Sequence, residues 1–297
     1  MRPALVACPP DRQVRLHCGR HEAIVCAEAG GRVLRWFTGS ASGRHDWLVP
    51  VDAQEWAADA WPKGGIFPLV PFSNRIRAGA FPADGRRIGL DLYPGQPHAL
   101  HGFAQENAWQ VVSQEADELA MEYTHQAGVR GWPWAWQARQ DVRLSPGGLR
   151  LVLEVVNLSD TPMPLGLGFH PYFTAQRVSL NAATNWQHEQ EMALCSQPNT
   201  VSTWDKGGET WTAFLSDWDG RAAMDWGDGT RLYMDTHGSM THVVLHSPAG
   251  RYLCVEPVSH VCDGFNLEAA GHVGTGVRWL APGRRTQVEL DLALPAN

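Results

Sequence analysis

Apolar and polar residues alternate one by one along much of this chain, and that pattern restricts its fold more than any other feature. Residues 286–294 read TQVELDLAL, with valine or leucine at every second position and acidic residues between them. Similar alternation occurs at 88–92, 119–123 and 149–155. Because successive side chains of a β-strand point to opposite faces, each segment is predicted to be a strand with one buried face.

Glycine-containing dipeptides lie between such segments, at Asp84-Gly85, Gly147-Gly148, Asp219-Gly220 and Asp228-Gly229. They supply the positive φ angles that tight hairpins require. Apolar runs at 23–26, 33–37 and 243–246 also have strand length. Helical periodicity is almost absent, and the best helix candidate is 53–61, which ends before Pro62. The pattern predicts an all-β fold, a large antiparallel β-sandwich with very little helix.

No internal repeat, low-complexity tract or linker interrupts the chain, so a single domain over residues 1–297 is expected.

The net charge is −7 and lysine and arginine form no cluster, whereas nucleic acid requires a basic face. No apolar stretch approaches the roughly 18 residues of a membrane span. The N-terminal apolar run meets Pro9-Pro10 too soon for a signal peptide. Six cysteines contain no CxxC pair. We expect a cytoplasmic protein with a small-molecule partner and no nucleic acid or membrane partner; the oligomeric state is not predicted.

Four segments depart from the alternation and concentrate polar residues beside glycine and proline: 71–76 (PFSNRI), 98–103 (HALHGF), 168–173 (GFHPYF) and 255–260 (VEPVSH). Functional side chains are frequent at loops and strand ends, where the scaffold can direct them. His170 lies in an apolar, proline-fixed turn that could hold the ring rigidly and tune its pKa. A core histidine bonded to a backbone carbonyl is the commoner explanation of such a residue.

Glu256 follows an apolar, strand-like run and precedes Pro257. A carboxylate there is costly to bury unless it is paired or used in chemistry; an edge-strand glutamate facing water is the alternative. Asn74 and Arg75 offer planar groups with several donors, suited to sugar hydroxyls, although a surface arginine that bridges strand ends is more common. His101 precedes Gly102, so its ring could point into a pocket.

The segments LVPFSNRI (69–76), HALHGF (98–103), GLGFHPYF (166–173), CVEPVSH (254–260) and DGFNL (263–267) together resemble the aldose 1-epimerase (galactose mutarotase-like) family. The likeness is closest to the shorter bacterial branch and spans roughly residues 20–294 in the expected order. It implies a supersandwich β fold with an open sugar-binding cleft, no cofactor and no metal. It also implies that His170 is the general acid and Glu256 the general base. Arg75 and His101 match residues that hold sugar hydroxyls, and Asn74 lies beside them.

The implied activity is aldose 1-epimerase (mutarotase) activity, an isomerase reaction that interconverts the α and β anomers of a free aldose. A base removes the proton of the C1 hydroxyl while an acid protonates the ring oxygen. The open-chain aldehyde then rotates about C1–C2 and closes on its other face. Most of the 14 tryptophans are expected in the core, and one or two could line the sugar site.

Two segments depart from the family pattern and leave the substrate open. The stretch 211–216 lacks the acidic residue that many members carry before a Trp-Asp-Gly turn, and 102–109 differs from the Trp and Arg pattern of the short branch. A phosphorylated sugar would need more than one cation near the cleft, and Arg75 is the only clear candidate, so a neutral sugar is expected.

Two other functions fit the same residues. A non-catalytic carbohydrate-binding or sensing protein could keep the fold without activity. A cupin-like metalloenzyme would use four ligands, namely His98, His101, His170 and Glu256, but the close His-x-His spacing of cupins is absent.

Overall fold

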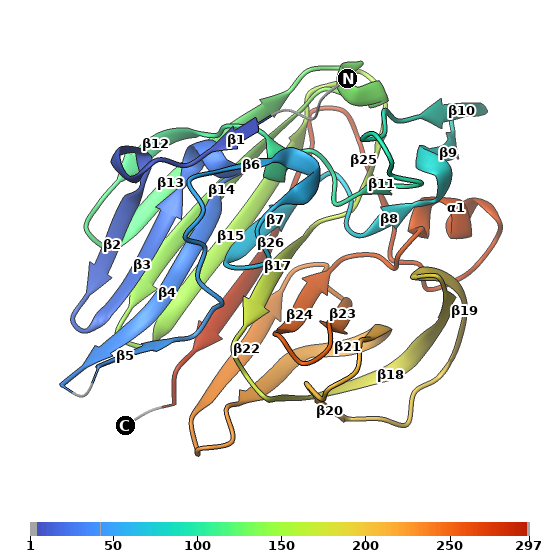
Figure 1. Ribbon diagram of the computed structural model, residues 1–297. Coiled ribbons are helices and arrows are strands. Elements are labelled where there is room, and N and C mark those ends of the chain that lie inside the picture. The colour runs from blue at the N-terminus through green and yellow to red at the C-terminus, as the bar shows by residue number, and fades with distance from the viewer. Residues whose placement is uncertain (1–4, 42, 296–297) are drawn as a thin grey trace.

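The computed structural model describes residues 5–41 and 43–295, and most of its strands belong to one large antiparallel sheet that folds into two layers (Figure 1). The first layer contains, in spatial order, β12 (Gln110–Gln114), β13 (Glu118–His125), β14 (Trp136–Ser145), β15 (Gly148–Asn157), β26 (Arg285–Ala293) and β22 (Arg231–His237). The second contains β2 (Val14–Cys18), β3 (His21–Cys26), β4 (Arg32–Ser40), β7 (Ile66–Leu69), β17 (Gly168–Phe173), β24 (Leu253–Val258) and β23 (His242–Ser247). The short β5 (Gly43–Asp46) pairs with β4.

Two long strands, β18 (Arg177–Glu189) and β21 (Trp211–Asp225), connect the layers. The first half of β21 pairs with β23 in the second layer, and its last residues pair with β22 in the first. Asp217 and Gly220 have φ angles of 53° and 83° between those halves. The prediction of a hairpin at Asp219-Gly220 is therefore wrong, because these residues form a bend inside one strand. β19 (Met192–Pro198) and β20 (Thr203–Asp205) pair with β18.

Short strand pairs and turns complete the fold. The pairs are β1 (Leu5–Ala7) with β6 (Glu55–Ala57), β8 (Arg75–Ile76) with β11 (Ala99–Leu100), β9 (Ala80–Ala83) with β10 (Arg86–Gly89), and β16 (Met163–Leu165) with β25 (Arg278–Leu280). The 3₁₀ turns are η1 (Pro10–Arg12), η2 (Ala27–Ala29), η3 (Ala58–Ala60), η4 (Arg77–Gly79), η5 (Ala104–Glu106) and η6 (Val129–Gly131). Within the described ranges, α1 (Gly264–Ala269) is the single α-helix, and no helix there is long and apolar enough to cross a membrane.

The all-β prediction is confirmed, and the strands expected at 119–123, 149–155 and 286–294 are β13, β15 and β26. The helix expected at 53–61 is wrong: the segment contains β6 and η3. Trp56 and Trp61, five positions apart, are both buried, and an α-helix would point them to different sides. The alternation at 88–92 also extends too far, since β10 ends at Gly89, opposite the first residue of β9. Leu92 is exposed.

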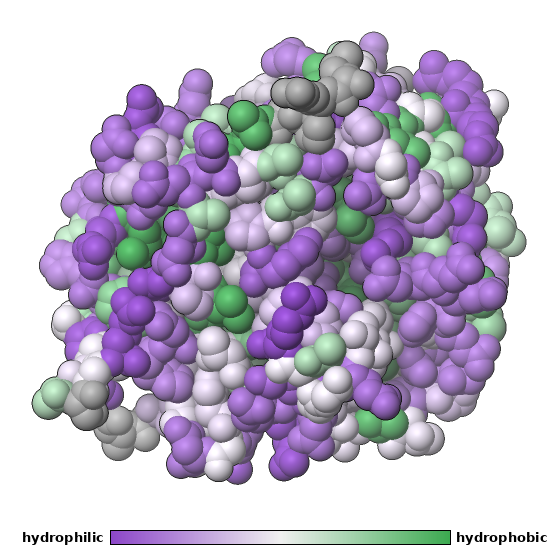
Figure 2. Space-filling view, viewed as in Figure 1, coloured by the Kyte–Doolittle hydropathy of each residue, from purple (hydrophilic) through white to green (hydrophobic). Residues whose placement is uncertain are grey.

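The alternation of side chains along each strand shows which residues of the second layer face the core and which face outward. In β17, Phe169 and Phe173 belong to the core between the layers, whereas Tyr172 packs in a separate apolar cluster on the other face. In β24, Val255 lies in the interlayer core and Cys254 in the outer cluster. Side chains at even-numbered positions of both strands therefore leave the interlayer core and face outward. Ten of the 14 tryptophans are buried, and they fill both clusters as expected. The view in Figure 2 shows a mainly hydrophilic surface with hydrophobic residues in small, separate groups.

Candidate active site

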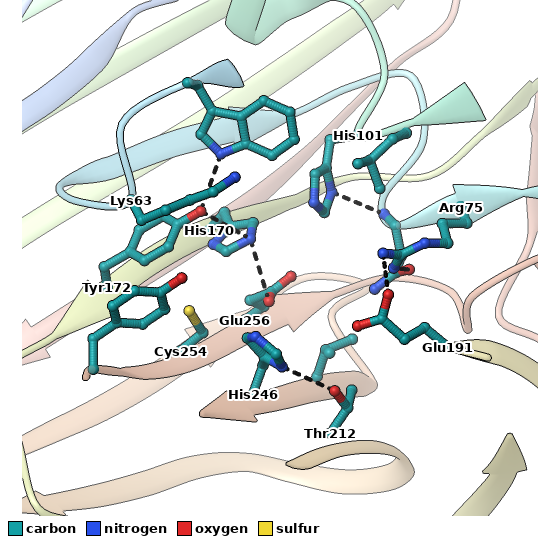
Figure 3. A pocket seen from close by; sticks show the side chains of 15 residues that line it. Lys63, Arg75, His101, His170, Tyr172, Glu191, Thr212, His246, Cys254 and Glu256 are labelled. Atoms are coloured by element: carbon teal, nitrogen blue, oxygen red, sulfur yellow. Dashed lines mark hydrogen bonds and ion pairs between the residues drawn. The ribbon is translucent and has the colours of Figure 1, made fainter. Parts of the chain in front are cut away.

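A cavity of about 150 Å³ lies on the outward face of the second layer, and all five predicted site residues line it. They are Asn74, Arg75, His101, His170 and Glu256. His170 comes from β17 and Glu256 from β24, while the other three come from the β8–β11 pair and the residues next to it. The fold thus brings together four segments that the sequence separates (Figure 3).

His170 and Glu256 are neighbours across two paired strands. Gly168 pairs with Val258 and Tyr172 with Cys254, so the register places His170 opposite Glu256 on one face. His170 Nε2 lies 3.4 Å from Glu256 Oε1. The residues are only 6% and 3% exposed, so little water screens this contact.

Aromatic side chains fix the His170 ring. It stacks on Tyr172 with centroids 4.5 Å apart and on Phe67 at 4.8 Å. The Trp61 indole N–H donates to Tyr172 Oη at 3.1 Å, and that oxygen is 3.4 Å from His170 Nε2. The His170 ring is therefore packed against two aromatic side chains, with its Nε2 near Glu256.

Burial shifts both pKa values of the pair toward the uncharged forms. It lowers the pKa of His170 well below 6.5, and the nearby His101, Lys63 and Arg32 add to this effect. It raises the pKa of Glu256 to about 8, against an opposing effect of Arg75. At neutral pH the resting pair is a neutral imidazole beside a protonated carboxyl, which together hold one exchangeable acidic proton.

The pair also leaves polar atoms without partners. His170 Nδ1 and Glu256 Oε2 are buried and have no hydrogen bond within the described part of the chain. An unpaired buried polar group costs about 1–3 kcal/mol, so this arrangement is unfavourable for stability. Such groups in a folded protein call for an explanation, and a catalytic role is one of them.

Asn74 and His101 fix each other through the backbone. Both have left-handed backbones, with φ of 53° and 59°. The His101 N–H donates to Asn74 O at 2.9 Å, and the Asn74 N–H donates to His101 Nδ1 at 3.2 Å. Burial lowers the pKa of His101 well below 6.5, so the ring is neutral. Because Nδ1 accepts a hydrogen bond, the ring proton is assigned to Nε2, where it can be donated to a ligand.

Arg75 donates to Asn74 Oδ1 at 3.2 Å and forms an ion pair with Glu191. Glu191 lies in the turn between β18 and β19, a segment that sequence reasoning did not select. The stretch 211–216, which has no acidic residue, contributes Thr212 to the cavity. The cavity nevertheless contains a second carboxylate, supplied by Glu191 from the neighbouring hairpin.

The remaining lining residues were also missed by sequence reasoning: Trp61, Lys63, Leu100, Tyr172, Val244, His246, Tyr252 and Cys254. His246 and Val244 alternate with core residues along β23, so strand periodicity could have placed them with Glu256 once the strand pairing was known. Lys63 and Trp61 lie in a loop without such a signal. No residue of 102–109 lines the cavity.

The ligand set of the metalloenzyme alternative is not assembled. His98 is outside the cavity, where its Nδ1 accepts the Ala78 N–H at 3.1 Å. Among residues 5–41 and 43–295, the group with metal-ligand atoms close together is His170, Cys254 and Glu256, all within 4.8 Å. Burial raises the pKa of the Cys254 thiol, and this favours its protonated form over the thiolate that binds metal.

The fold places the chain among the galactose mutarotase-like β-sandwich proteins. A solved structure from Escherichia coli K12 matches with a TM-score of 0.81 at 24% identity, covering 96% of this chain and 99% of that one. A galactose mutarotase-like protein from Clostridium acetobutylicum matches with a TM-score of 0.78 at 18% identity, covering 100% and 99%.

The chain belongs to the aldose 1-epimerase family, because the model of that family matches residues 12–293. It is also 29% identical over 252 residues to the uncharacterized protein YphB of Escherichia coli (strain K12). That match covers 76% of this chain and 82% of YphB.

Proposed function

We propose that this protein is an aldose 1-epimerase, an isomerase that interconverts the α and β anomers of a free aldose through ring opening. One observation supports this most: a buried His170–Glu256 pair, 3.4 Å apart, in the wall of a polar cavity. The C1 hydroxyl and the ring oxygen are bonded to the same carbon. An acid and a base this close can therefore reach both oxygens of one sugar.

The proposed roles are Glu256 as base and His170 as acid. When the shared proton moves from the carboxyl to the imidazole, the pair becomes a carboxylate beside an imidazolium. Burial makes that carboxylate a stronger base and that imidazolium a stronger acid than the free side chains. Glu256 takes the C1 hydroxyl proton while His170 protonates the ring oxygen, and the C1–ring oxygen bond breaks. After rotation about C1–C2, the reverse transfers close the ring on its other face.

The other predicted residues bind and orient the sugar in this proposal. His101 offers its Nε2–H, and Arg75 and Asn74 offer further donors from the same wall of the cavity. These groups would hold ring hydroxyls so that C1 faces the pair. General acid and base groups each contribute on the order of 10²–10⁴-fold to rate, and orientation adds to both.

A sugar-binding protein without catalysis is the second candidate, motivated by the missing acid in 211–216. Glu191 weakens that motivation, because it places a carboxylate in the cavity from another segment. The two functions differ in one measurement: saturation transfer between α and β anomer signals in NMR, across a panel of aldoses. Faster exchange with at least one sugar supports the epimerase. Binding without acceleration of any sugar would support the sugar-binding protein.

A further inference from the structure

Lys63 is the pocket cation that the proposed chemistry does not use. It lies between η3 and β7, and its Nζ is 3.7 Å from the centroid of the Trp61 ring. No carboxylate in residues 5–41 and 43–295 forms a salt bridge with it. The residue is exposed to solvent, so a ligand can reach it. The chain has only one other lysine, Lys206, which is outside the cavity.

A buried arginine fixes the loop that carries Lys63. Arg32 is fully buried and donates to Pro62 O at 3.1 Å and to Gly64 O at 3.0 Å, on either side of Lys63. Its guanidinium also lies 4.3 Å from the centroid of Phe67, the ring that stacks on His170. Lys63 is thus anchored at both neighbours, and Figure 3 shows its amine directed toward the space above His170.

The charged side chains around the cavity give it a net positive charge. The Arg75 charge is matched by Glu191, and Glu256 is protonated at neutral pH because burial raises its pKa to about 8. Among the described residues, Lys63 and Arg32 form no salt bridge, and both stay mainly protonated at neutral pH because burial lowers their pKa values only to about 8 and about 10. The charge of Lys63 also lowers the pKa values of His101, His170 and His246. A positive cavity in a chain of net charge −7 attracts an anion specifically to this place.

We propose that the substrate is an aldose with an anionic substituent at C6, a carboxylate or a phosphate, and that Lys63 binds this substituent. The inference rests on the proposed function, because that function sets the orientation of the ring. The ring oxygen, which faces His170, is bonded to both C1 and C5, and C5 carries C6. A C6 substituent therefore lies on the His170 side of the sugar, where the Lys63 amine points. This replaces the expectation of a neutral sugar, which counted Arg75 as the only cation.

The test compares glucose and galactose with their uronic acids and their 6-phosphates at pH 7. Calorimetric titration gives the Kd of each sugar, and anomer-exchange NMR gives kcat/KM. Wild type is compared with Lys63→Met and with Lys206→Met as the matched control. A charge-assisted hydrogen bond contributes about 1.5–3 kcal/mol, which corresponds to roughly 10- to 100-fold in affinity. We expect one anionic series to bind at least tenfold more tightly than its neutral parent. Lys63→Met should remove that preference, and Lys206→Met should keep it.

The two anionic series distinguish a carboxylate from a phosphate ligand. Neutral sugars that bind as well as both series would overturn the inference, as would a Lys63→Met variant that keeps the anionic preference. Because binding is measured separately, failure of the proposed function gives a different result: the anionic preference persists while no sugar exchanges faster. Lys63→Met is an exposed substitution, and circular dichroism confirms that the variant is folded.

Discussion

His170 and Glu256 have pKa values displaced in opposite directions by the same cause. Burial disfavours the charged form of each group, so it lowers the pKa of the imidazole and raises that of the carboxyl. The order of the two pKa values is reversed relative to the free side chains. This reversal keeps one proton on the pair over a wider pH range than free histidine and glutamate would allow.

The pH dependence of activity should show this reversal. As pH rises through about 8, Glu256 loses its proton, the pair holds none and the acid is lost. As pH falls below 6.5, His170 stays neutral because its pKa lies well below that value. For a neutral sugar, kcat/KM measured by polarimetry should therefore be flat from about pH 6.5 to 7.5 and fall tenfold per unit above about 8. If kcat/KM instead began to decline as pH rose above 6.5, a histidine with an ordinary pKa would control the rate.

Glu256 should also make the protein less stable as pH rises. Its pKa is about 8 in the folded protein and 4.5 for an ordinary glutamate, the value expected in the unfolded chain. Between these pH values the unfolded chain therefore releases a proton that the folded chain keeps. The stability from the neutral carboxyl is complete below 4.5 and lost as pH rises through about 8. In urea unfolding, the free energy of unfolding of Glu256→Gln relative to that of wild type should rise by on the order of 2–4 kcal/mol between pH 5 and pH 8. A stability difference that is constant with pH would contradict the shifted pKa.

At the scale of elements, strands β17 and β24 carry His170 and Glu256, the proposed acid–base pair, and the β8–β11 pair with its adjacent residues carries the groups proposed to bind the sugar. The second unit depends on a close backbone contact. Gly102 has φ of 67°, and a Cβ at this position would lie 2.2 Å from Val70 O. The carbonyl of Val70 also accepts the Phe103 N–H at 3.0 Å. A side chain at 102 would therefore separate the His101 segment from the end of β7.

Gly102→Ala should be more destabilising than a glycine substitution with equal backbone strain alone. Gly85 is the matched control, because its φ is 69° and no heavy atom lies within 4 Å of the place that a Cβ would take there. Strain in the left-handed region costs roughly 1–2 kcal/mol, and this should be the whole effect at Gly85. Urea unfolding should show a loss beyond about 2 kcal/mol for Gly102→Ala, together with a raised KM. Equal losses in the two variants would show that the Val70 contact is not tight.

At the scale of the whole molecule, the sequence was informative wherever periodicity is local. Alternation predicted β13, β15 and β26, because one buried face is enough to impose it. It failed at the bend in β21, since an Asp-Gly dipeptide has the same signature in a hairpin and inside a strand. The 53–61 segment failed because its pairing partner, β1, lies about 50 residues earlier.

The site likewise divides into residues that the sequence predicted and residues that only the fold brings to the cavity. The five predicted residues line one cavity, and their selection rested on family motifs, because each signal alone fitted a structural role. Lys63 and Glu191 reach the cavity from a loop and a hairpin turn with no pattern of their own, so only the fold places them there. The roles of the five residues, the absence of a cofactor and the single domain over 1–297 stay predictions.

The central claim is that the fold unites two residues 86 positions apart in sequence into one proton-transfer unit. The most direct test is a double-mutant cycle in anomer exchange, with His170→Asn, Glu256→Gln and the double variant on the best sugar. Each single variant should lose on the order of 10²–10⁴-fold in kcat. Since the residues act as a unit, the double variant should lose little more than the worse single one. Losses that multiply in the double variant, or a single variant near wild-type rate in a folded protein, would contradict the account.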